Sequence, residues 1–357
     1  MKIKRRKSKA IKIGQITIGG NHPIAIQSMT KTSTSSIEAT LRQIEELTAA
    51  GCEIIRLSVR DFGDAKAIKK IKPFSRVPLV ADIHFDFRLA LAAIDNGIDK
   101  IRLNPGNIYK LDQLREITRA AKAAHIPIRV GVNSGSLRSH RSQVTGYKSQ
   151  ADEMVKSALD YVKILEKFGF YEIVLSLKAS DIFATIDAYR KIAKYCDYPL
   201  HLGTTATGEP AEGMVKSAIA LGTLLLEGIG DTLRVSLTDR PLTEVRVAKS
   251  ILEALGLREF GPQIISCPTC GRCSVDLVRM VKDLAEGIST LNHRGVSRPI
   301  KVAVMGCTVN GPGEAKEADL GIAFGKKEGL LFKKGRALRK ISVAKAIGEL
   351  LKEMKKK

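Results

Sequence analysis

The chain has 357 residues, a formal net charge of +22 and 44% hydrophobic residues, enough to build a core in one large or two ordinary domains. No apolar run is long enough to span a bilayer, and the basic N-terminal stretch MKIKRRKSK is not followed by the apolar segment of a secretory signal. The composition argues against a membrane protein, and we expect a cytoplasmic protein with reduced thiols.

The excess of Lys and Arg predicts an acidic partner, such as a nucleic acid, a phosphorylated small molecule or an acidic protein. Much of the charge lies at the two ends of the chain, and we interpret those ends as solvated basic surface. Proteins that bind nucleic acids usually add aromatic side chains or a known module. Because the chain has no Trp and only 5% aromatic residues, its charge alone does not indicate a nucleic acid.

Residues 11–20, IKIGQITIGG, alternate apolar side chains around a glycine turn, which predicts a small hairpin that plugs or caps the domain formed by the residues after it. One unit then recurs: a short apolar strand, a polar residue at its end, a loop and an amphipathic helix. The expected strands are Pro23–Gln27, Glu53–Leu57, Pro78–Ala81, Lys100–Leu103, Pro127–Val132, Glu172–Leu177, Pro199–Leu202 and Thr232–Ser236. The expected helices include Ser36–Ala50, with Ser35 as its N-cap and Gly51 past its end, and Arg88–Asn96, Leu111–Ala124, Asp152–Phe168, Ile182–Tyr195 and Val245–Leu255.

Eight such units predict a TIM, or (β/α)8, barrel over residues 1–258. An open doubly wound sheet is the alternative, but no Gly-x-Gly-x-x-Gly follows a strand to support a dinucleotide site. Gly261 and Pro262 mark a boundary, after which residues 259–357 are expected to form a smaller α/β domain. Its expected elements are the strands Ile264–Ser266, Ile300–Met305, Leu320–Ala323 and Leu330–Phe332 and the helices Val275–Leu284 and Ser342–Glu353.

Active sites of such barrels lie at the carboxyl ends of the strands, and this end is expected to gather cations. The polar residues expected there include Arg56, Asp82, His84, Arg102, Arg129, Asn133, Lys178, His201, Arg234 and Ser236. Arginine matches phosphate oxygens with two hydrogen bonds, and like charges repel unless an anion lies among them. The alternative is that each arginine pairs with a carboxylate at the rim, but Asp82 can neutralise only one or two. The pattern favours a polyanionic ligand, most simply a diphosphate.

Four of the six cysteines lie in two short stretches of the second domain, SCPTCGRC and MGCTVNGPGE. A Cys-x-x-Cys turn holds two thiolates close together, and Cys307 adds a third, which suits an iron–sulfur cluster or zinc. Buried thiols without a metal are the remaining alternative, and a disulfide framework is less expected in a chain with no secretory signal. No Cys-x-x-x-Cys-x-x-Cys is present, which argues against a radical adenosylmethionine enzyme.

Motifs along nearly the whole chain resemble one family, the 4-hydroxy-3-methylbut-2-enyl diphosphate synthases of the methylerythritol phosphate route to isoprenoids, in their short two-domain bacterial form. The motifs are IQSMT, EIIRLSV, ADIHFDFR, KIRLNPGN, IRVGVNSGSL, LSLKASD, LHLG, VKSAIALG, EGIGDTLRVSL, SCPTC and GCTVNGPGE. The last two are the most specific. The resemblance implies a TIM barrel followed by an α/β iron–sulfur domain.

The resemblance also implies a [4Fe–4S] cluster held by Cys267, Cys270, Cys307 and Glu314. The residues alone suggest Cys273 as the fourth ligand, but position 277 is Leu, so a ferredoxin run is incomplete. A carboxylate is a harder and more labile iron ligand than a thiolate. Glu314 can therefore yield its iron to the substrate.

The reaction implied is the two-electron reductive ring opening and dehydration of 2-C-methyl-D-erythritol 2,4-cyclodiphosphate. The residues implied to bind it are Arg56, Arg102, Arg129, Asn133, Lys178, His201, Thr205, Arg234 and Ser236. The family usually carries a catalytic Glu where this chain has Ala206. Its acid–base role is expected to pass to Glu209, Asp82, His84 or water, with Glu314 as the catalytic ligand.

The implied partners are flavodoxin or ferredoxin as electron donor and a second copy in a head-to-tail homodimer, with no nucleic acid and no membrane. Two other functions remain open at this stage. One is a nucleic-acid-binding iron–sulfur protein that uses the basic ends, and the other is a barrel transferase for a phosphorylated substrate with a structural zinc. Metal analysis separates the reductase from the transferase. The reductase should contain iron and acid-labile sulfide, whereas the transferase should be colourless and contain zinc.

Overall fold

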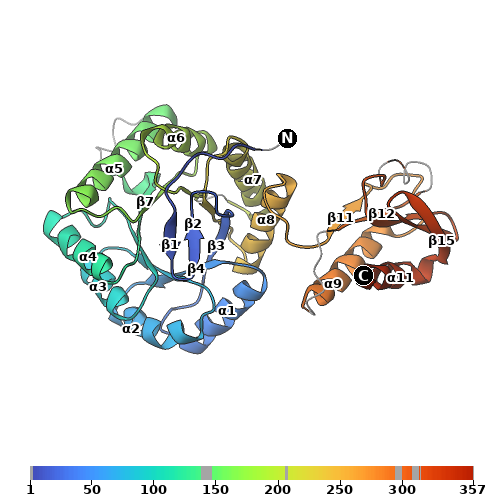
Figure 1. The fold of residues 1–357 in the computed structure, drawn as a ribbon, viewed down its shortest axis with the longest axis horizontal. Coiled ribbons are helices and arrows are strands. Elements are labelled where there is room, and N and C mark those ends of the chain that lie inside the picture. The colour runs from blue at the N-terminus through green and yellow to red at the C-terminus, as the bar shows by residue number, and fades with distance from the viewer. Residues whose placement is uncertain are drawn as a thin grey trace. The chain divides into compact units, whose positions relative to one another are not determined.

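The computed structural model describes residues 3–137, 147–205, 208–293, 300–307, 313 and 315–356. The chain divides into two compact units, Met1–Arg258 and Glu259–Lys357, which are coloured blue to gold and orange to red in Figure 1. No helix among the described residues is long and apolar enough to cross a membrane.

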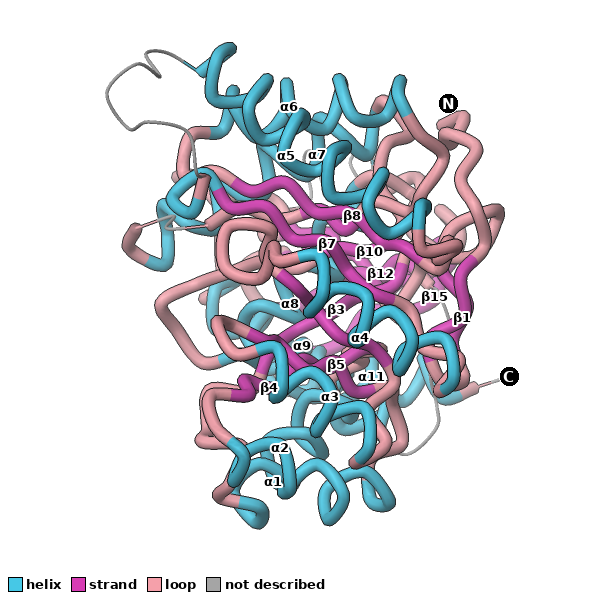
Figure 2. Tube along the Cα trace, turned by 90° about the vertical axis from the view of Figure 1, so that its left-hand side faces the viewer, coloured by secondary structure: helices cyan, strands magenta, loops and turns pink. Residues whose placement is uncertain are grey.

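The first unit is a TIM barrel, as predicted. Its parallel strands are β3 (Ala25–Met29), β4 (Ile54–Val59), β5 (Leu79–Ile83), β6 (Lys100–Leu103), β7 (Ile128–Asn133), β8 (Ile173–Lys178), β9 (His201–Leu202) and β10 (Thr232–Leu233). They pair in chain order, β10 pairs with β3, and a bridge between Leu175 and Leu200 joins the remaining edges. The helices form the outer ring seen in Figure 1, and the side view of Figure 2 shows them above and below the strands. They are α1 (Ile37–Ala49), α2 (Phe62–Ile71), α3 (Phe87–Asp95), α4 (Leu111–Ala123), α5 (Tyr147–Lys167), α6 (Ile182–Tyr195), α7 (Pro210–Leu226) and α8 (Pro241–Ala254).

The strand register sorts the inward side chains into levels of four, each level drawn from alternate strands. These levels position the site because arginines make up most of the top level, whereas the two levels beneath it mix apolar and polar side chains. The three levels that matter below are, from bottom to top, Ile54, Lys100, Val174 and Thr232; then Gln27, Val80, Arg129 and His201; then Arg56, Arg102, Ser176 and Arg234.

The predicted hairpin is formed by β1 (Ile11–Ile13) and β2 (Ile16–Ile18), and it plugs the bottom of the barrel. Ile11, Ile13 and Ile18 are buried against the lowest inward residues of the strands, Ala25, Ile54, Val80 and Val174. Figure 1 shows the pair inside the ring of strands. The opposite end of the barrel is therefore left for the ligand.

The basic N-terminus is not simply solvated surface, and that interpretation is wrong for Arg5 and Arg6. Both side chains are largely buried and reach the buried carboxylate of Asp231, Arg5 at 3.1 Å and Arg6 at 3.7 Å. Arg6 also donates to the carbonyls of Cys196 and Tyr198. The segment straps the start of the chain to the ends of two barrel strands, so its charge is structural.

The start of α1 also differs from the prediction. Ser36, not Ser35, is the N-cap residue, and its side chain makes no capping hydrogen bond. The backbone N–H of Ser35 instead donates to Asp64 at 2.8 Å, which ties this loop to α2. Gly51 follows the helix end with φ of +93°, as its predicted position requires.

The second unit is a five-stranded sheet in the order β11 (Gln263–Ser266), β12 (Lys301–Met305), β13 (Leu320–Phe324), β14 (Glu328–Lys333) and β15 (Arg336–Ser342). The first three strands are parallel. The helices α9 (Leu277–His293) and α11 (Ala346–Lys355) pack on it around Leu284, Ile322 and Leu350. The predicted helix Ser342–Glu353 is wrong at its start, because Ser342 ends β15.

Candidate functional site

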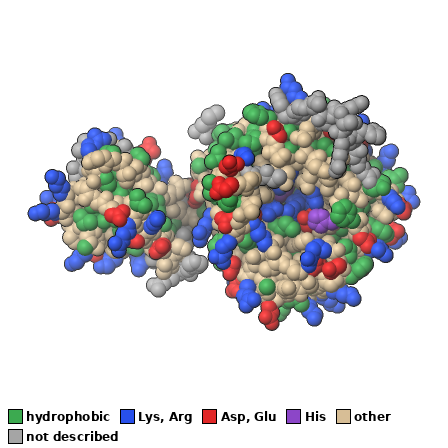
Figure 3. All heavy atoms as spheres, turned by 180° about the vertical axis from the view of Figure 1, so that it is seen from behind, with side chains coloured by type: hydrophobic (Ala, Val, Ile, Leu, Met, Phe, Trp, Pro, Cys, Tyr) green, Lys and Arg blue, Asp and Glu red, His purple; other side chains and the backbone are tan. Residues whose placement is uncertain are grey.

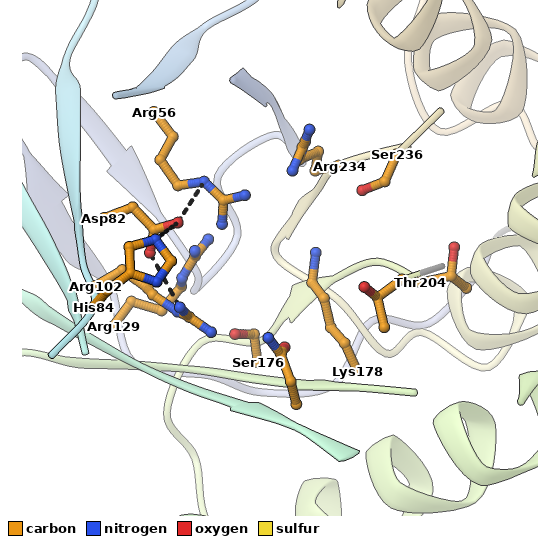
Figure 4. A pocket seen from close by; sticks show the side chains of 12 residues that line it. Arg56, Asp82, His84, Arg102, Arg129, Ser176, Lys178, Thr204, Arg234 and Ser236 are labelled. Atoms are coloured by element: carbon orange, nitrogen blue, oxygen red, sulfur yellow. Dashed lines mark hydrogen bonds and ion pairs between the residues drawn. The ribbon is translucent and has the colours of Figure 1, made fainter. Parts of the chain in front are cut away.

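The carboxyl ends of the barrel strands enclose a charged pocket. Figure 3 faces this end and shows a hollow with blue Lys and Arg side chains beside a purple His. Side chains from seven strands and loops line it, and Figure 4 draws them converging. The lining residues are Arg56, Asp82, His84, Arg102, Arg129, Asn133, Ser176, Lys178, Thr204, Thr205, Arg234 and Ser236.

Asp82 organises one side of the pocket. Its carboxylate lies 3.1 Å from Arg102 Nη1 and 3.6 Å from Arg56 Nε, and His84 Nε2 stands 3.9 Å away. Burial acts to raise the pKa of Asp82, but Arg56, Arg102 and Arg129 hold it well below its usual range. Asp82 is therefore an anion that positions two arginines.

A glycine makes room for one of these arginines. Arg102 Nη2 donates to the carbonyl of Gly131 at 3.1 Å. A Cβ at position 131 would lie 2.5 Å from Arg102 Nε, so any larger residue there would displace the guanidinium.

On the far side of the pocket, a second acid holds Arg234. Glu244, on α8, is buried and lies 3.2 Å from Arg234 Nε, and it also accepts from the Ser28 hydroxyl at 3.0 Å. The sequence reasoning missed Glu244, because an acid in the first turn of a helix is what the helix dipole alone predicts. Ser176 was also missed, although the period of two along a strand could have identified it. It lies two residues before Lys178 on the same face of β8.

Arg129 and Lys178 make no ion pair among the described residues, although both are buried in the pocket wall. Burial and the neighbouring cations lower the pKa of each well below its ordinary value. Arg129 Nε and Nη1 have no hydrogen-bond partner in the part of the chain that is described. Buried cations without counter-ions are costly, so this pocket is built for an anion.

Not every predicted site residue lies in the pocket. His201 is fully buried one level below it, where its Nδ1 lies 2.8 Å from Thr232 Oγ1. Glu209 is exposed at the start of α7 and does not line the pocket. Ala206 and Glu314 lie outside the described residues.

The levels beneath the pocket are also polar. Lys100 is fully buried, and its Nζ has no hydrogen-bond partner among the described atoms. The same holds for both amide atoms of Gln27 and for His201 Nε2. The pKa values of Lys100 and His201 are lowered, in both cases chiefly by burial and next by Arg129.

The cysteine loops of the second unit leave two neighbouring parallel strands. Cys267 follows β11 and Cys307 follows β12, whose residues Ser266 and Val304 are paired. The backbone N–H of Gly306 donates to Cys267 Sγ at 3.3 Å. A Cβ at Gly306 would lie 2.4 Å from Cys273 Sγ, so only glycine allows this approach.

The individual thiols differ in character. Cys270 is exposed, and hydrogen bonds from the backbone and side chain of Arg272 lower its pKa, which favours the thiolate. Cys273 donates to the carbonyl of Val275 at 3.2 Å. No three His, Cys, Asp or Glu side chains among the described residues form a preassembled metal site. The donor set of Cys267, Cys270 and Cys307 nevertheless fits a sulfur-ligated iron centre, since two adjacent strand ends supply soft ligands.

Comparisons with known proteins cover both units. The model of the GcpE TIM-barrel domain matches residues 8–249, and that of the GcpE protein C-terminal domain matches residues 263–356. A protein of Thermodesulfovibrio yellowstonii is 51% identical over 99% of this chain and 100% of its own length. Proteins of Fusobacterium nucleatum, at 50% identity over 97% and 96%, and of Lawsonia intracellularis, at 53% over 94% and 92%, are similar. All three carry the name 4-hydroxy-3-methylbut-2-en-1-yl diphosphate synthase (flavodoxin).

Among solved structures, the barrel is similar to dihydropteroate synthase from Yersinia pestis, with a TM-score of 0.51 at 12% identity over 69% of this chain and 98% of that one. The enzyme from Xanthomonas albilineans gives 0.51 at 13% identity over 70% and 99%. At these identities the likeness shows the barrel fold alone.

Proposed function

The chain belongs to the GcpE family, and from this premise we propose how its barrel mouth and its cysteine loops take part in one reductive reaction. The protein is an oxidoreductase of isoprenoid-precursor biosynthesis, a 4-hydroxy-3-methylbut-2-en-1-yl diphosphate synthase. It opens the ring of 2-C-methyl-D-erythritol 2,4-cyclodiphosphate and removes water. Counted on fully protonated phosphates, two electrons and two protons enter, one C–O bond to phosphate breaks, and one hydroxyl leaves as water.

The observation that carries the substrate assignment is the charge balance of the pocket. Asp82 and Glu244 hold three of its arginines, while Arg129 and Lys178 make no ion pair among the described residues. A diphosphate supplies the missing negative charge, and each charge-assisted hydrogen bond to it contributes roughly 1.5–3 kcal/mol.

The uncharged pocket residues orient the rest of the substrate. Asn133, Thr205 and Ser236 offer an amide and two hydroxyls to its oxygens. His201 supports this floor from one level below. His84 lies beside Asp82 and is more exposed than Asp82, with 42% of its side chain exposed.

Because its arginines keep Asp82 ionised, the role of proton donor at the rim falls to His84. Glu209 would need to move into the pocket to take part.

We assign a [4Fe–4S] cluster to Cys267, Cys270, Cys307 and Glu314. When bound, such a cluster supplies single electrons and a Lewis-acidic iron. The Gly306 N–H that reaches Cys267 Sγ tunes the charge on that sulfur, and the thiolate character of Cys270 prepares it as a ligand. Cys273, bonded to a carbonyl, is left out of the set.

We further propose flavodoxin as the electron donor, a role printed in the relatives' name, and a head-to-tail homodimer in which each pocket meets the partner's cysteine loops. Reduced thiols are those of a cytoplasm, where we place the enzyme. Arg5 and Arg6 are engaged by the barrel itself, so these two residues do not support nucleic-acid binding.

The test is anaerobic reconstitution with iron and sulfide, followed by reduction of the cyclic diphosphate with dithionite-reduced methyl viologen. Cys267→Ser, Cys270→Ser and Cys307→Ser are each expected to lose the cluster absorbance and the activity, whereas Cys273→Ser keeps both. A colourless protein that holds zinc and no sulfide would favour the transferase instead. Loss of the cluster in Cys273→Ser, with a normal cluster in Glu314→Ala, would reverse the ligand assignment.

A further inference from the structure

Beside Cys267, the CPTC loop and the first half of α9 enclose a shallow recess, which we call the α9 recess. It is lined by Ser266, Cys267, Pro268, Thr269, Leu277, Val278, Val281 and Lys282. We propose that the α9 recess is the surface on which the flavodoxin docks while it reduces the cluster. The inference rests on the proposed function and goes further by naming the docking surface.

The recess has the make-up of a protein docking surface, with an apolar centre and a charged rim. Val278 is 60% exposed on α9, and Pro268 is exposed on the loop opposite. Val281 continues the apolar strip one helical turn on, and Lys282 follows it at the rim. The exposed apolar edge of a bound flavin matches this recess in chemistry.

The position of the recess matters more than its polarity. Cys267 forms part of its wall, and the same thiolate is assigned as a cluster ligand. A flavin seated there would lie against a residue that is assigned as a cluster ligand. Thr269, at the turn of the loop, has a φ of +65°, a strained conformation for a β-branched residue. The strain shows that the loop shape beside Cys267 is held by its surroundings.

The charge of the second unit complements an acidic carrier protein. From residue 259 to the end, Lys and Arg number nineteen against ten Asp and Glu. The acids nearest the recess on α9 interact with Arg279, because Asp283 lies 3.9 Å from its Nε and Asp276 accepts from its backbone N–H at 3.1 Å. Lys282, which is exposed at the rim, is therefore left to attract the acidic groups around a flavodoxin's flavin.

The electron balance requires two encounters per turnover. In each, a two-electron-reduced flavodoxin gives one electron to the cluster and leaves in its one-electron-oxidised form. A docking surface for such a cycle must release its partner quickly, and a small apolar recess with a cationic rim suits a weak, salt-sensitive complex.

The experiment compares two electron donors in the reconstituted holoenzyme. Val278→Asp and Lys282→Glu are assayed with reduced flavodoxin and, separately, with reduced methyl viologen, which needs no docking surface. We expect the KM for flavodoxin to rise about tenfold or more in each variant, while the viologen-driven rate stays within twofold. The matched control is Ile219→Asp, which places the same charge on an exposed apolar position of α7 in the barrel.

Each outcome decides between distinct interpretations. An unchanged KM for flavodoxin in both variants overturns the proposal. A fall in the viologen-driven rate of both variants, with the cluster absorbance intact, also overturns it, because the recess would then contact the substrate-binding barrel. If the unmodified holoenzyme reduces the cyclic diphosphate with neither donor, the proposed function fails, and the failure is not specific to the docking surface.

Discussion

Lys178 is the residue whose protonation most directly couples the pocket to its ligand. It lies in the wall beside Arg129, and a Cβ on Gly203 would approach its Nζ to 2.3 Å, so the ammonium is closely surrounded. Burial, then Arg129, Arg56 and other cations, lower its pKa well below the ordinary value for lysine. A bound diphosphate reverses the electrostatic part of that shift, so binding takes up a proton.

The first prediction rests on the direction of that shift. Because the complex holds a proton that the unliganded protein loses as pH rises, affinity for the cyclic diphosphate should fall as pH rises through the lowered pKa of Lys178. The fall should approach tenfold per pH unit once Lys178 is deprotonated. Calorimetric titrations without reductant, in buffers of different ionisation heat, measure both the affinity and the proton uptake.

Lys178→Arg is the matched variant, because arginine keeps its charge through this range. It should bind with a flatter pH dependence and less proton uptake. Proton release on binding, or the same pH slope in the variant, would mean that another group titrates.

Lys100 affects the stability of the barrel. It lies two levels beneath Arg56 and Arg102, and it is a fully buried amine with no hydrogen-bond partner among the described residues. Its lowered pKa means that the unfolded chain binds more protons below pH 10.5, so this residue makes stability rise with pH. Replacing an unpaired buried amine by an apolar side chain of similar length removes that penalty.

The second prediction is that Lys100→Met raises the free energy of unfolding at pH 7 by about 1–4 kcal/mol, with a smaller gain at pH 9.5. Urea denaturation at both pH values measures it. Lys110→Met, at an exposed position, is the control and should change stability by less than about 0.5 kcal/mol. A destabilised Lys100→Met would show that the buried amine has a hydrogen-bond acceptor, such as an internal water.

At the level of single residues, much of the pocket could be predicted. The period of two along a strand, together with the barrel rule, placed Arg56, Arg102 and Lys178 at one end, and they line the pocket. Glu244 could not be found, because it lies in the first turn of a helix, where an acid is expected without any role in the pocket. His201 was expected at the mouth but lies below it, since β9 reaches the barrel's end only with Gly203 and Thr204. The roles of these residues remain predictions.

Among the elements, the barrel strands follow from apolar runs that are buried on both faces. β6 begins and ends as predicted, and most other strands shift by one or two residues. β15 was missed because Arg336–Ser342 is exposed at six of its seven positions and carries three basic residues, so it shows no buried face. Its pairing with β14, not its own sequence, makes it a strand.

The N-terminal strap gives the third prediction. Asp231 has a side chain only 4% exposed, and it accepts from Arg5 Nη2 at 3.1 Å, Ser8 Oγ at 2.8 Å and the backbone N–H of Leu200 at 2.8 Å. Asp231→Ala removes the acceptor that these three donors share and should lower the free energy of unfolding by about 3–5 kcal/mol.

Asp197→Ala is the matched control, because its pair with Lys9, at 3.3 Å, is exposed on both sides. It should cost less than about 1 kcal/mol. Guanidinium denaturation of both variants measures the difference. Equal losses would show that the strap contributes nothing beyond surface charge.

At the scale of the whole molecule, the pocket and the cysteine loops belong to different compact units, yet the proposed reaction needs both at one substrate. Only residues 255–262 separate α8 from β11, and an extended chain spans at most about 3.3–3.6 Å per residue. Gly256 and Gly261 both have positive φ, a backbone conformation that residues with a side chain rarely adopt. We interpret the link as a hinge that lets the cysteine loops of one chain close over the pocket of its partner.

The last prediction tests that arrangement by complementation. Arg102→Ala breaks the pocket and Cys307→Ser breaks the cluster ligand set, so each homodimer should be inactive. In a mixed dimer whose sites each combine one chain's barrel with the other chain's loops, one site carries both lesions and the other carries neither. Random exchange of equal amounts should therefore restore roughly a quarter of the unmodified activity. A mixture of Arg102→Ala with Arg129→Ala is the control and should stay inactive, because both barrels are then damaged. If the first mixture also stays inactive although subunit exchange is demonstrated, each site is built within one chain, and the head-to-tail assembly is wrong.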